Sequence, residues 1–197
     1  MLTAVHFTSW LWLALEIGLV VRDRRRGRGS AAADRGTRWV VVVLTLAATL
    51  AATLAATVFG VVLPAGSGIR FAALGHPHWA PAAGLAVMVT GLAVRCWSVL
   101  VLGRAFRTTV EVDRGQEVVT RGPYRWVRHP SYTGVLLLAG GYGLAAGNWL
   151  SLLCTVVLPL ASVLVRIDVE EQVLTRVLGR PYERYQAATK RLVPGVW

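Results

Sequence analysis

Long apolar runs divide this chain and decide what it can fold into. An α-helix rises about 1.5 Å per residue, so about 20 apolar residues cross the roughly 30 Å of hydrocarbon in a bilayer. Hydrophobic residues make up 55% of the sequence and charged residues only 16%. Five runs come near the required length: 2–21, 39–63, 82–102, 131–146 and 149–165. The sequence therefore predicts an all-α integral membrane protein with about five transmembrane helices.

The positive charge lies between these runs. The chain has a net charge of +11, and residues 22–38 alone hold seven arginines. Nucleic-acid binding would need a basic face on a soluble module, so we expect no nucleic-acid partner. Lys and Arg are enriched in cytoplasmic loops. This rule predicts a multi-pass protein of the plasma or inner membrane, with the turns at Pro64 and Gly147 outside. Residues 22–38, residues 103–128 and the C-terminal tail then face the cytoplasm, as does any site built from them.

Two ionisable residues fall inside predicted spans. Glu16 lies in the first run and Arg95 in the third. A charge in hydrocarbon is costly unless it is paired, so such residues face the interior of the bundle. Our hypothesis is that Glu16 and Arg95 pair. Cys96 and Cys154 also lie in predicted spans, and we interpret them as small buried hydrophobic residues.

A possible metal motif precedes the third span. His76 and His78 are separated by one residue, a spacing that metal sites use. No third ligand stands nearby, and Trp79 directly follows. We interpret the segment as an interfacial turn anchored by Trp79, and we expect no metal.

Residues 121–134 concentrate polar side chains at the start of the fourth run. Pro130 disfavours helix at His129 and suits a first helical turn, so we expect His129 directly before unpaired backbone N–H groups. Helix N-termini of this kind bind anions. A basic linker beside the membrane is the alternative interpretation. Upstream, residues 108–112 and 117–120 alternate like two strands, which predicts a small hairpin or an ordered loop.

The fourth and fifth runs are joined by a two-residue turn, so they must be antiparallel neighbours. The fifth run continues as a helix through Glu171, in which Arg166 and Glu170 share one face. The hairpin brings this face to the depth of His129. An ordinary surface ion pair, contributing about a few tenths of a kcal/mol, is the alternative interpretation.

Several motifs of the C-terminal half occur together. They are Arg128-His129-Pro130-Ser131-Tyr132-x-Gly134, Gly147-Asn148, Glu170-Glu171, Gly179-x-x-Tyr182-x-x-Tyr185 and Arg191-Leu192-Val193-Pro194. Across residues 103–197 this combination resembles the isoprenylcysteine carboxyl methyltransferase family. The resemblance implies a membrane enzyme that binds S-adenosyl-L-methionine in a cytoplasmic pocket of this half. It implies no Rossmann sheet, and the sequence holds no glycine-rich dinucleotide fingerprint. We divide the chain into N-terminal transmembrane helices, 1–102, and a methyltransferase region, 103–197.

The resemblance also implies roles for single residues. By position, the cofactor contacts of the family fall on Gln116, Glu117, Val118, Val119, Tyr124, His129, Pro130, Ser131, Tyr132 and Glu170. Arg166 matches the position used near the acceptor group, so it is the expected substrate-binding residue. Arg166, Glu170 and His129 are the expected catalytic residues.

These residue types fit methyl transfer, which chiefly requires two partners to be aligned and desolvated. A carboxylate acceptor needs a cation such as Arg166 to place it, and no general base. A thiol, hydroxyl or amine would instead lose a proton, with Glu170 or His129 as the candidate base. The expected acceptor is lipophilic and enters from the bilayer, most of all an isoprenylcysteine-type carboxylate. A phospholipid amine, an isoprenoid acid and a thiol stay open.

Two other functional classes share features with this sequence. Membrane sterol reductases have a similar His-Pro-x-Tyr hairpin and bind NADPH there, which makes a reductase the alternative enzyme. A non-enzymatic membrane scaffold is the third interpretation. The Glu170-Glu171 pair and the small size of the chain favour the transferase. The oligomeric state does not follow from the sequence.

Overall fold

The computed structural model describes residues 2–25, 31–32, 43, 47, 78–112, 116–147 and 149–196. In these residues the helices are α1 (Leu2–Arg25), α3 (Ala80–Leu102), α4 (Pro130–Ala145), α5 (Trp149–Leu178) and α6 (Arg180–Ala188). Short 3-10 turns follow α3 and precede α4: η3 (Gly103–Ala105) and η4 (Gly122–Arg125). Except for residues 43 and 47, the predicted span 39–63 lies outside the described residues, as does His76.

Three of the described helical stretches are long and apolar enough to cross a membrane: Thr3–Arg25, Ala80–Ala105 and Trp149–Leu178. The predicted class, an all-α integral membrane protein, is confirmed. The fourth predicted run corresponds to α4, which has only 16 residues. The fifth continues without a break to Leu178, as the sequence predicted for a helix leaving the membrane.

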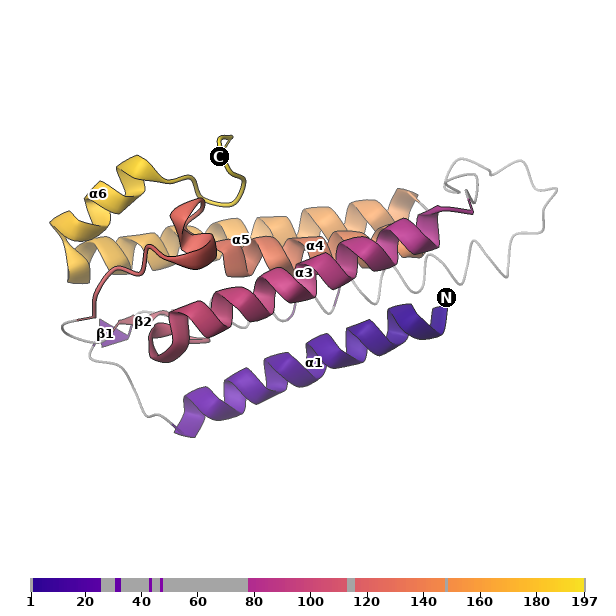
Figure 1. Cartoon of the computed structure of the whole chain (residues 1–197), viewed down its shortest axis with the longest axis horizontal. Coiled ribbons are helices and arrows are strands. Elements are labelled where there is room, and N and C mark those ends of the chain that lie inside the picture. Colours follow the sequence, from indigo (N-terminus) through magenta and orange to yellow (C-terminus); the bar gives the residue numbers. More distant parts are fainter. Residues whose placement is uncertain are drawn as a thin grey trace.

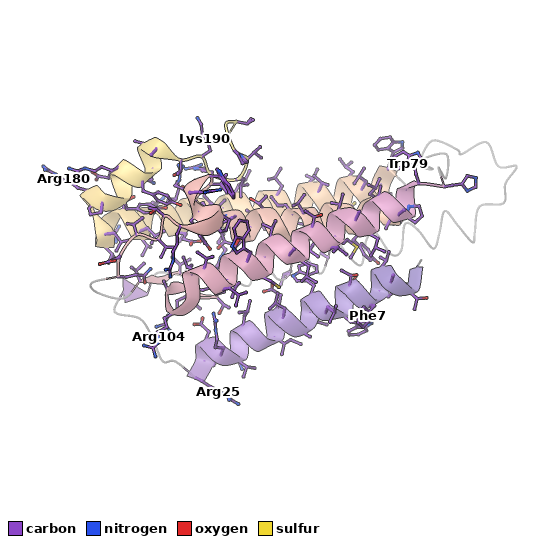
Figure 2. The ribbon with its side chains drawn as sticks, in the orientation of Figure 1. Phe7, Arg25, Trp79, Arg104, Arg180 and Lys190 are labelled. Carbon is purple, nitrogen blue, oxygen red and sulfur yellow. The ribbon has the colours of Figure 1, made fainter. Side chains whose placement is uncertain are left out.

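The helices lie roughly parallel to one long axis. In Figure 1, α3, α4 and α5 form an antiparallel group, and α1 runs alongside α3 in the same direction. α6 folds back over the end of α5, at the end of the bundle that also holds η4. Arg25, Arg104 and Arg180 lie toward this end and Trp79 toward the other (Figure 2). The basic segments are thus gathered where the start of α4 meets the tail.

Glycines allow α3 and α4 to approach closely. A Cβ placed on Gly91 would lie 2.7 Å from the carbonyl oxygen of Gly134, and one on Gly84 would lie 2.6 Å from that of Gly141. These distances are shorter than any carbon–oxygen contact a side chain tolerates, so backbone meets backbone at both points. Small residues drive helix association in lipid, where burying apolar side chains gives no advantage over acyl chains. The close contact fixes the start of α4 against α3.

The predicted hairpin in the loop after α3 is wrong, and the ordered-loop alternative holds. The short strand β2 (Glu111–Val112) pairs antiparallel with β1 (Ala31–Ala32), and residues 116–120 form no strand. The alternating valines instead pack on a helix: Val110 and Val112 are buried against Val173 of α5. Packing on a helix therefore explains a periodicity that resembles strand pairing.

The hypothesised pair between Glu16 and Arg95 is present. The guanidinium of Arg95 donates from Nε and Nη2 to the two carboxylate oxygens of Glu16, each at 2.9 Å. Arg95 also donates to the hydroxyl of Ser131 in the first turn of α4, and it lies 5.5 Å from the centre of the Phe106 ring. This network connects α1 and α3 to the start of α4 through a charge pair in which Arg95 is buried and Glu16 is half-buried.

Candidate active site

The C-terminal tail runs beside the start of α4. Val127 and Lys190 form a parallel bridge, and the N–H groups of Arg128 and His129 donate to the carbonyls of Lys190 (2.7 Å) and Arg191 (3.0 Å). His129 itself has a non-helical backbone, with φ −123° and ψ 53°, and α4 begins at Pro130. Pro130 therefore starts the helix as predicted. The segment before α4 and the C-terminal tail, which the sequence predicted to lie on the same side of the membrane, are thus in contact.

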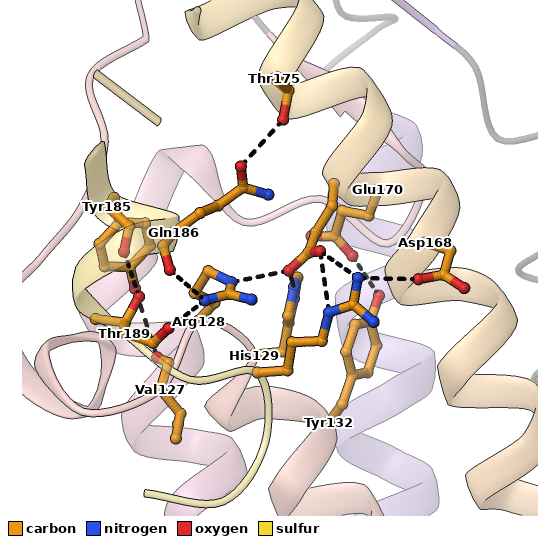
Figure 3. A network of polar contacts seen from close by, with 12 residues as sticks. Val127, Arg128, His129, Tyr132, Asp168, Glu170, Thr175, Tyr185, Gln186 and Thr189 are labelled. Carbon is orange, nitrogen blue, oxygen red and sulfur yellow. Dashed lines mark hydrogen bonds and ion pairs between the residues drawn. The ribbon is translucent and has the colours of Figure 1, made fainter. Parts of the chain in front are cut away.

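Glu171 is the centre of a buried ionic cluster, whose members Arg128 and His129 are labelled in Figure 3. Its carboxylate accepts from Arg128 Nε at 2.8 Å and from Arg191 Nη2 at 2.8 Å, and it lies 3.2 Å from His129 Nε2. Arg128 also donates to the carbonyls of Gln186 and Thr189. One side chain of α5 thus holds the start of α4, the end of α6 and the tail together. The sequence interpretation gave Glu171 no role, although the Glu-Glu motif was a signal.

Tyr132 connects Glu170 with Arg166. Its hydroxyl donates to Glu170 Oε2 at 2.7 Å and accepts from Arg166 Nε at 2.6 Å, so the shared face of α5 meets α4 through a phenol. The ring of Tyr132 stacks on His129, with centroids 5.7 Å apart. Arg166 is buried and also donates from Nη2 to the carbonyl of Thr108 at 2.5 Å. The structure therefore brings His129, Tyr132, Arg166 and Glu170 into one connected group.

Tyr124 and Ser131 are buried beside this group. The hydroxyl of Tyr124 donates to the carbonyl of Ser98 at 3.3 Å, and the carbonyl of Tyr124 accepts from the hydroxyl of Tyr185 at 2.6 Å. Burial raises the pKa of Tyr185 to about 12, so this phenol stays a neutral donor at physiological pH. Ser131 holds Arg95. Both residues have structural partners in addition to the cofactor contacts that we expected of them.

The remaining predicted contacts lie in the loop between β2 and η4. Glu117 is exposed, and Gln116, Val118 and Val119 are half-buried. Val118 lines a groove of about 380 Å³ with Thr120, Arg125, Pro181, Arg184, Tyr185, Ala188 and Thr189. A larger groove of about 560 Å³ lies beside Glu171 and is lined by Asp168, Glu171, Gln172, Thr175, Arg176, Gln186 and Arg191. The cofactor role of residues 116–119 stays a prediction.

Tyr182 has an unsatisfied hydroxyl. Its side chain is only 3% exposed, and among the described residues its oxygen finds no hydrogen-bond partner. Burial raises the pKa of this phenol, and the carboxylates of Glu171 and Glu170 raise it further. Leaving a buried hydroxyl without a partner costs about 1–3 kcal/mol. Sequence reasoning used Tyr182 as a family motif and did not assign it to the site.

Comparison with known proteins places this arrangement in a family. The family profile described as phospholipid methyltransferase matches residues 79–181, which is more than half of the chain. The chain belongs to the phospholipid methyltransferase family. The matched region of this methyltransferase family begins at α3 and ends in α6, so it contains the whole connected group around Tyr132.

Within the family, the relatives point to one branch. The chain is 30% identical over 130 residues to protein-S-isoprenylcysteine O-methyltransferase B of Arabidopsis thaliana, covering 65% of this chain and 66% of the plant protein. It is 32% identical over 129 residues to the protein-S-isoprenylcysteine O-methyltransferase of Tribolium castaneum, covering 63% of this chain and 45% of the beetle protein. The resemblance predicted from the motifs is confirmed.

A solved structure agrees with the fold. The eukaryotic intramembrane Ras methyltransferase, an isoprenylcysteine carboxyl methyltransferase, matches with a TM-score of 0.60 and 26% identity. The match covers 79% of this chain and 52% of that chain. This member of the phospholipid methyltransferase family thus spans between about half and two thirds of the length of the proteins it matches.

Proposed function

We propose that the protein is an integral-membrane methyltransferase. It moves a methyl group from S-adenosyl-L-methionine to the carboxylate of a lipophilic acceptor of the isoprenylcysteine type. The observation that carries the proposal is the Arg166–Tyr132–Glu170 chain of hydrogen bonds, with His129 stacked beside it. Similarity to relatives named protein-S-isoprenylcysteine O-methyltransferase supports the acceptor class.

The residues around Glu170 fit the cofactor. S-adenosyl-L-methionine carries a positive sulfonium and an amino group, and a half-buried carboxylate beside tyrosine rings suits such cations. The free hydroxyl of Tyr182 offers a further hydrogen bond. We assign the cofactor to Glu170, Tyr124, Tyr182 and the helix start formed by His129, Pro130, Ser131 and Tyr132, with residues 116–119 along its edge. When bound, the cofactor supplies an electrophilic methyl group that reaches a carboxylate without any proton transfer.

Arg166 binds and orients the acceptor. Its contacts with Tyr132 and Thr108 hold the plane of the guanidinium, and this planar fork matches a carboxylate. Because an ionised carboxylate is already nucleophilic, neither Glu170 nor His129 has to remove a proton. His129 instead orients the ring of Tyr132, and Glu171 holds His129 in place. The residues of the chain thus align two partners and exclude water.

The site faces the cytoplasm of the plasma or inner membrane in this proposal. Its support is the gathering of Arg25, Arg104 and Arg180 toward the same end of the bundle as the site (Figure 2). Residues 103–197 supply the catalytic groups, and residues 1–102 supply the N-terminal transmembrane helices. The acceptor enters from the bilayer, where lipids surround the helices.

A binding and turnover experiment tests the function. Detergent-solubilised protein is titrated calorimetrically with S-adenosyl-L-methionine and, separately, with NADPH. Methyl transfer is then followed with radiolabelled cofactor and three acceptors: N-acetyl-S-farnesyl-L-cysteine, phosphatidylethanolamine and dodecanethiol. We expect binding of S-adenosyl-L-methionine alone and methylation of the farnesylcysteine carboxylate. Binding of NADPH alone would support the reductase, and exclusive methylation of the amine or the thiol would overturn the acceptor class.

A further inference from the structure

We propose that Asp23 of α1 is a positioning residue for Arg166 and acts through Thr108. The N-terminal helix then takes part in the acceptor end of the site, although the family match begins only at residue 79. The inference rests on the proposed function for the role of Arg166. The link between Asp23 and Arg166 itself rests on contacts of the described residues.

Asp23 holds Thr108 at two points. Its Oδ2 accepts from the backbone N–H of Thr108 at 2.9 Å and from the hydroxyl of the same residue at 2.6 Å. Bonds to the amide and to the side chain of one residue fix how that residue is rotated about its Cα atom. The position of the Thr108 carbonyl carbon is thereby fixed, and only rotation about the Cα–C bond is left to turn its oxygen.

The Thr108 carbonyl is the group that holds Arg166. It accepts from Arg166 Nη2, while Tyr132 accepts from Nε of the same guanidinium. The guanidinium is therefore held from two sides, by α4 through Tyr132 and by the loop after α3 through Thr108. Rotation of Thr108 would turn the plane of the fork away from the position in which it binds a carboxylate. A misplacement of about 1 Å can lower turnover about a hundredfold.

Burial strengthens this connection. Asp23 is only 8% exposed, and Arg107 lies 3.6 Å from its other carboxylate oxygen. Hydrogen bonds to a charged group are about twice as strong as those between neutral groups. The loop is thus held in one orientation by a side chain in the last turn of α1. Arg25 and Arg104 mark these neighbouring ends of α1 and α3 in Figure 2.

Three variants separate positioning from simple folding. Asp23→Ala removes both bonds to Thr108, Asp23→Asn keeps an oxygen that accepts them, and Arg24→Gln changes the charge of an exposed neighbour as a control. With N-acetyl-S-farnesyl-L-cysteine as acceptor, we expect Asp23→Ala to lower kcat/KM about tenfold. Cofactor affinity should stay within about twofold, because the Glu170 side of the site is untouched. Asp23→Asn should restore most of the activity, and Arg24→Gln should match the parent protein.

A double-mutant cycle measures whether the effects of Asp23 and Arg166 on turnover are coupled, which a purely structural role of Asp23 would not produce. If Asp23 acts through Arg166, Asp23→Ala should cost less than about twofold in an Arg166→Lys background, because the group it positions is already gone. A second loss of about tenfold in that background would overturn the inference. So would equal losses of cofactor affinity and turnover in Asp23→Ala alone.

A spectroscopic measurement keeps the test independent of activity. In protein labelled with ¹⁵N-arginine, the Arg166 Nε–H resonance is identified by its absence in Arg166→Lys. We expect Asp23→Ala to shift this resonance and Arg24→Gln to leave it in place; an unchanged resonance in Asp23→Ala overturns the link. If Asp23→Ala does not fold, Thr108→Val, which removes one of the two bonds, takes its place with the same expected direction. A parent protein that methylates none of the acceptors defeats the proposed function, while the resonance still decides the link.

Discussion

Glu170 and Glu171 are adjacent in sequence, yet their carboxylates bind different elements. Glu170 accepts from Tyr132 of α4, whereas Glu171 accepts from Arg128 in the loop before α4 and from Arg191 in the tail. Successive side chains on a helix point about 100° apart, so one pair of residues can serve two interfaces. Glu171 assembles the site, and Glu170 is left to contact what binds there.

The two carboxylates should respond differently to loss of charge. Glu171→Gln leaves the buried guanidinium of Arg128 without a carboxylate partner and removes one of the two carboxylates that contact Arg191, so we expect the free energy of unfolding to fall by about 3–5 kcal/mol. Glu170→Gln should change stability little and weaken cofactor binding at least about tenfold. His129→Ala should weaken cofactor binding to a similar degree. Thermal unfolding in detergent, together with calorimetric titration, measures both quantities. Equal effects of the two glutamate changes on stability would contradict this division.

Arg166→Lys distinguishes an acceptor site from a structural ion pair. Lys cannot reproduce the bidentate geometry of a guanidinium, so turnover should fall by about an order of magnitude or more while cofactor affinity persists. A side chain that only balanced Glu170 would tolerate the change. Both quantities are to be measured on one preparation. Loss of both together, or of neither, rules out the assigned role.

Tyr182→Phe should weaken cofactor binding without lowering the stability of the free protein. Its hydroxyl has no partner among the described residues, so removing it should leave the stability of the free protein unchanged or raise it slightly. The cofactor should then bind about three- to tenfold more weakly, because one hydrogen bond contributes about 0.5–1.5 kcal/mol. Tyr185→Phe is the matched control: it loses a bond to the Tyr124 carbonyl and should destabilise the free protein.

The contact between α3 and α4 should not tolerate a larger residue. In Gly91→Val the new Cβ would lie 2.7 Å from a backbone oxygen that cannot move alone, so the helices must separate. We expect a loss of about 1–3 kcal/mol in unfolding free energy, and lower activity because α4 carries the site. At Gly18 of α1 a Cβ would meet nothing within 4 Å, so Gly18→Ala is the control and should be neutral or stabilising.

Labelling should reveal the orientation of the protein in its membrane. After Cys96 and Cys154 are replaced by serine, a single cysteine is introduced at Trp79 or at Arg104. An impermeant maleimide added outside intact cells should label the first position and not the second. The reverse pattern would place the proposed site on the outer side and would contradict the topology.

The sequence predicted the parts of this structure that depend on local rules. The helical period put Arg166 and Glu170 on one face, and a two-residue turn forced α4 and α5 to pair. Contacts between segments that are distant in the sequence were harder to predict. Nothing local indicates that Glu111 and Val112 pair with residues 31–32, or that Thr108 bonds to Asp23, because each contact depends on how α1 sits against α3.

The cofactor contacts expected from the family resemblance show the same limit: sequence alone does not give the arrangement of side chains between helices. Carrying a family pattern over by position placed His129, Tyr132 and Glu170 together, and the structure brings them into contact. It did not reveal that Tyr132 lies between Arg166 and Glu170, because side-chain order across two helices depends on their rotation. Glu171 was missed for a related reason: its partners come from a tail whose return path has no periodic signal.

The shortness of α4 decides how a partner would meet this protein. Sixteen residues give about 24 Å of helix, roughly 6 Å less than the hydrocarbon thickness. A helix of this length crosses the bilayer only where the surrounding lipid thins locally. Such thinning would bring His129 and Tyr132, at one end of α4, toward the level of the acyl chains. A lipid-borne molecule reaches them by diffusing in two dimensions, so the rate of encounter depends on how strongly the molecule partitions into the membrane rather than on its concentration in water.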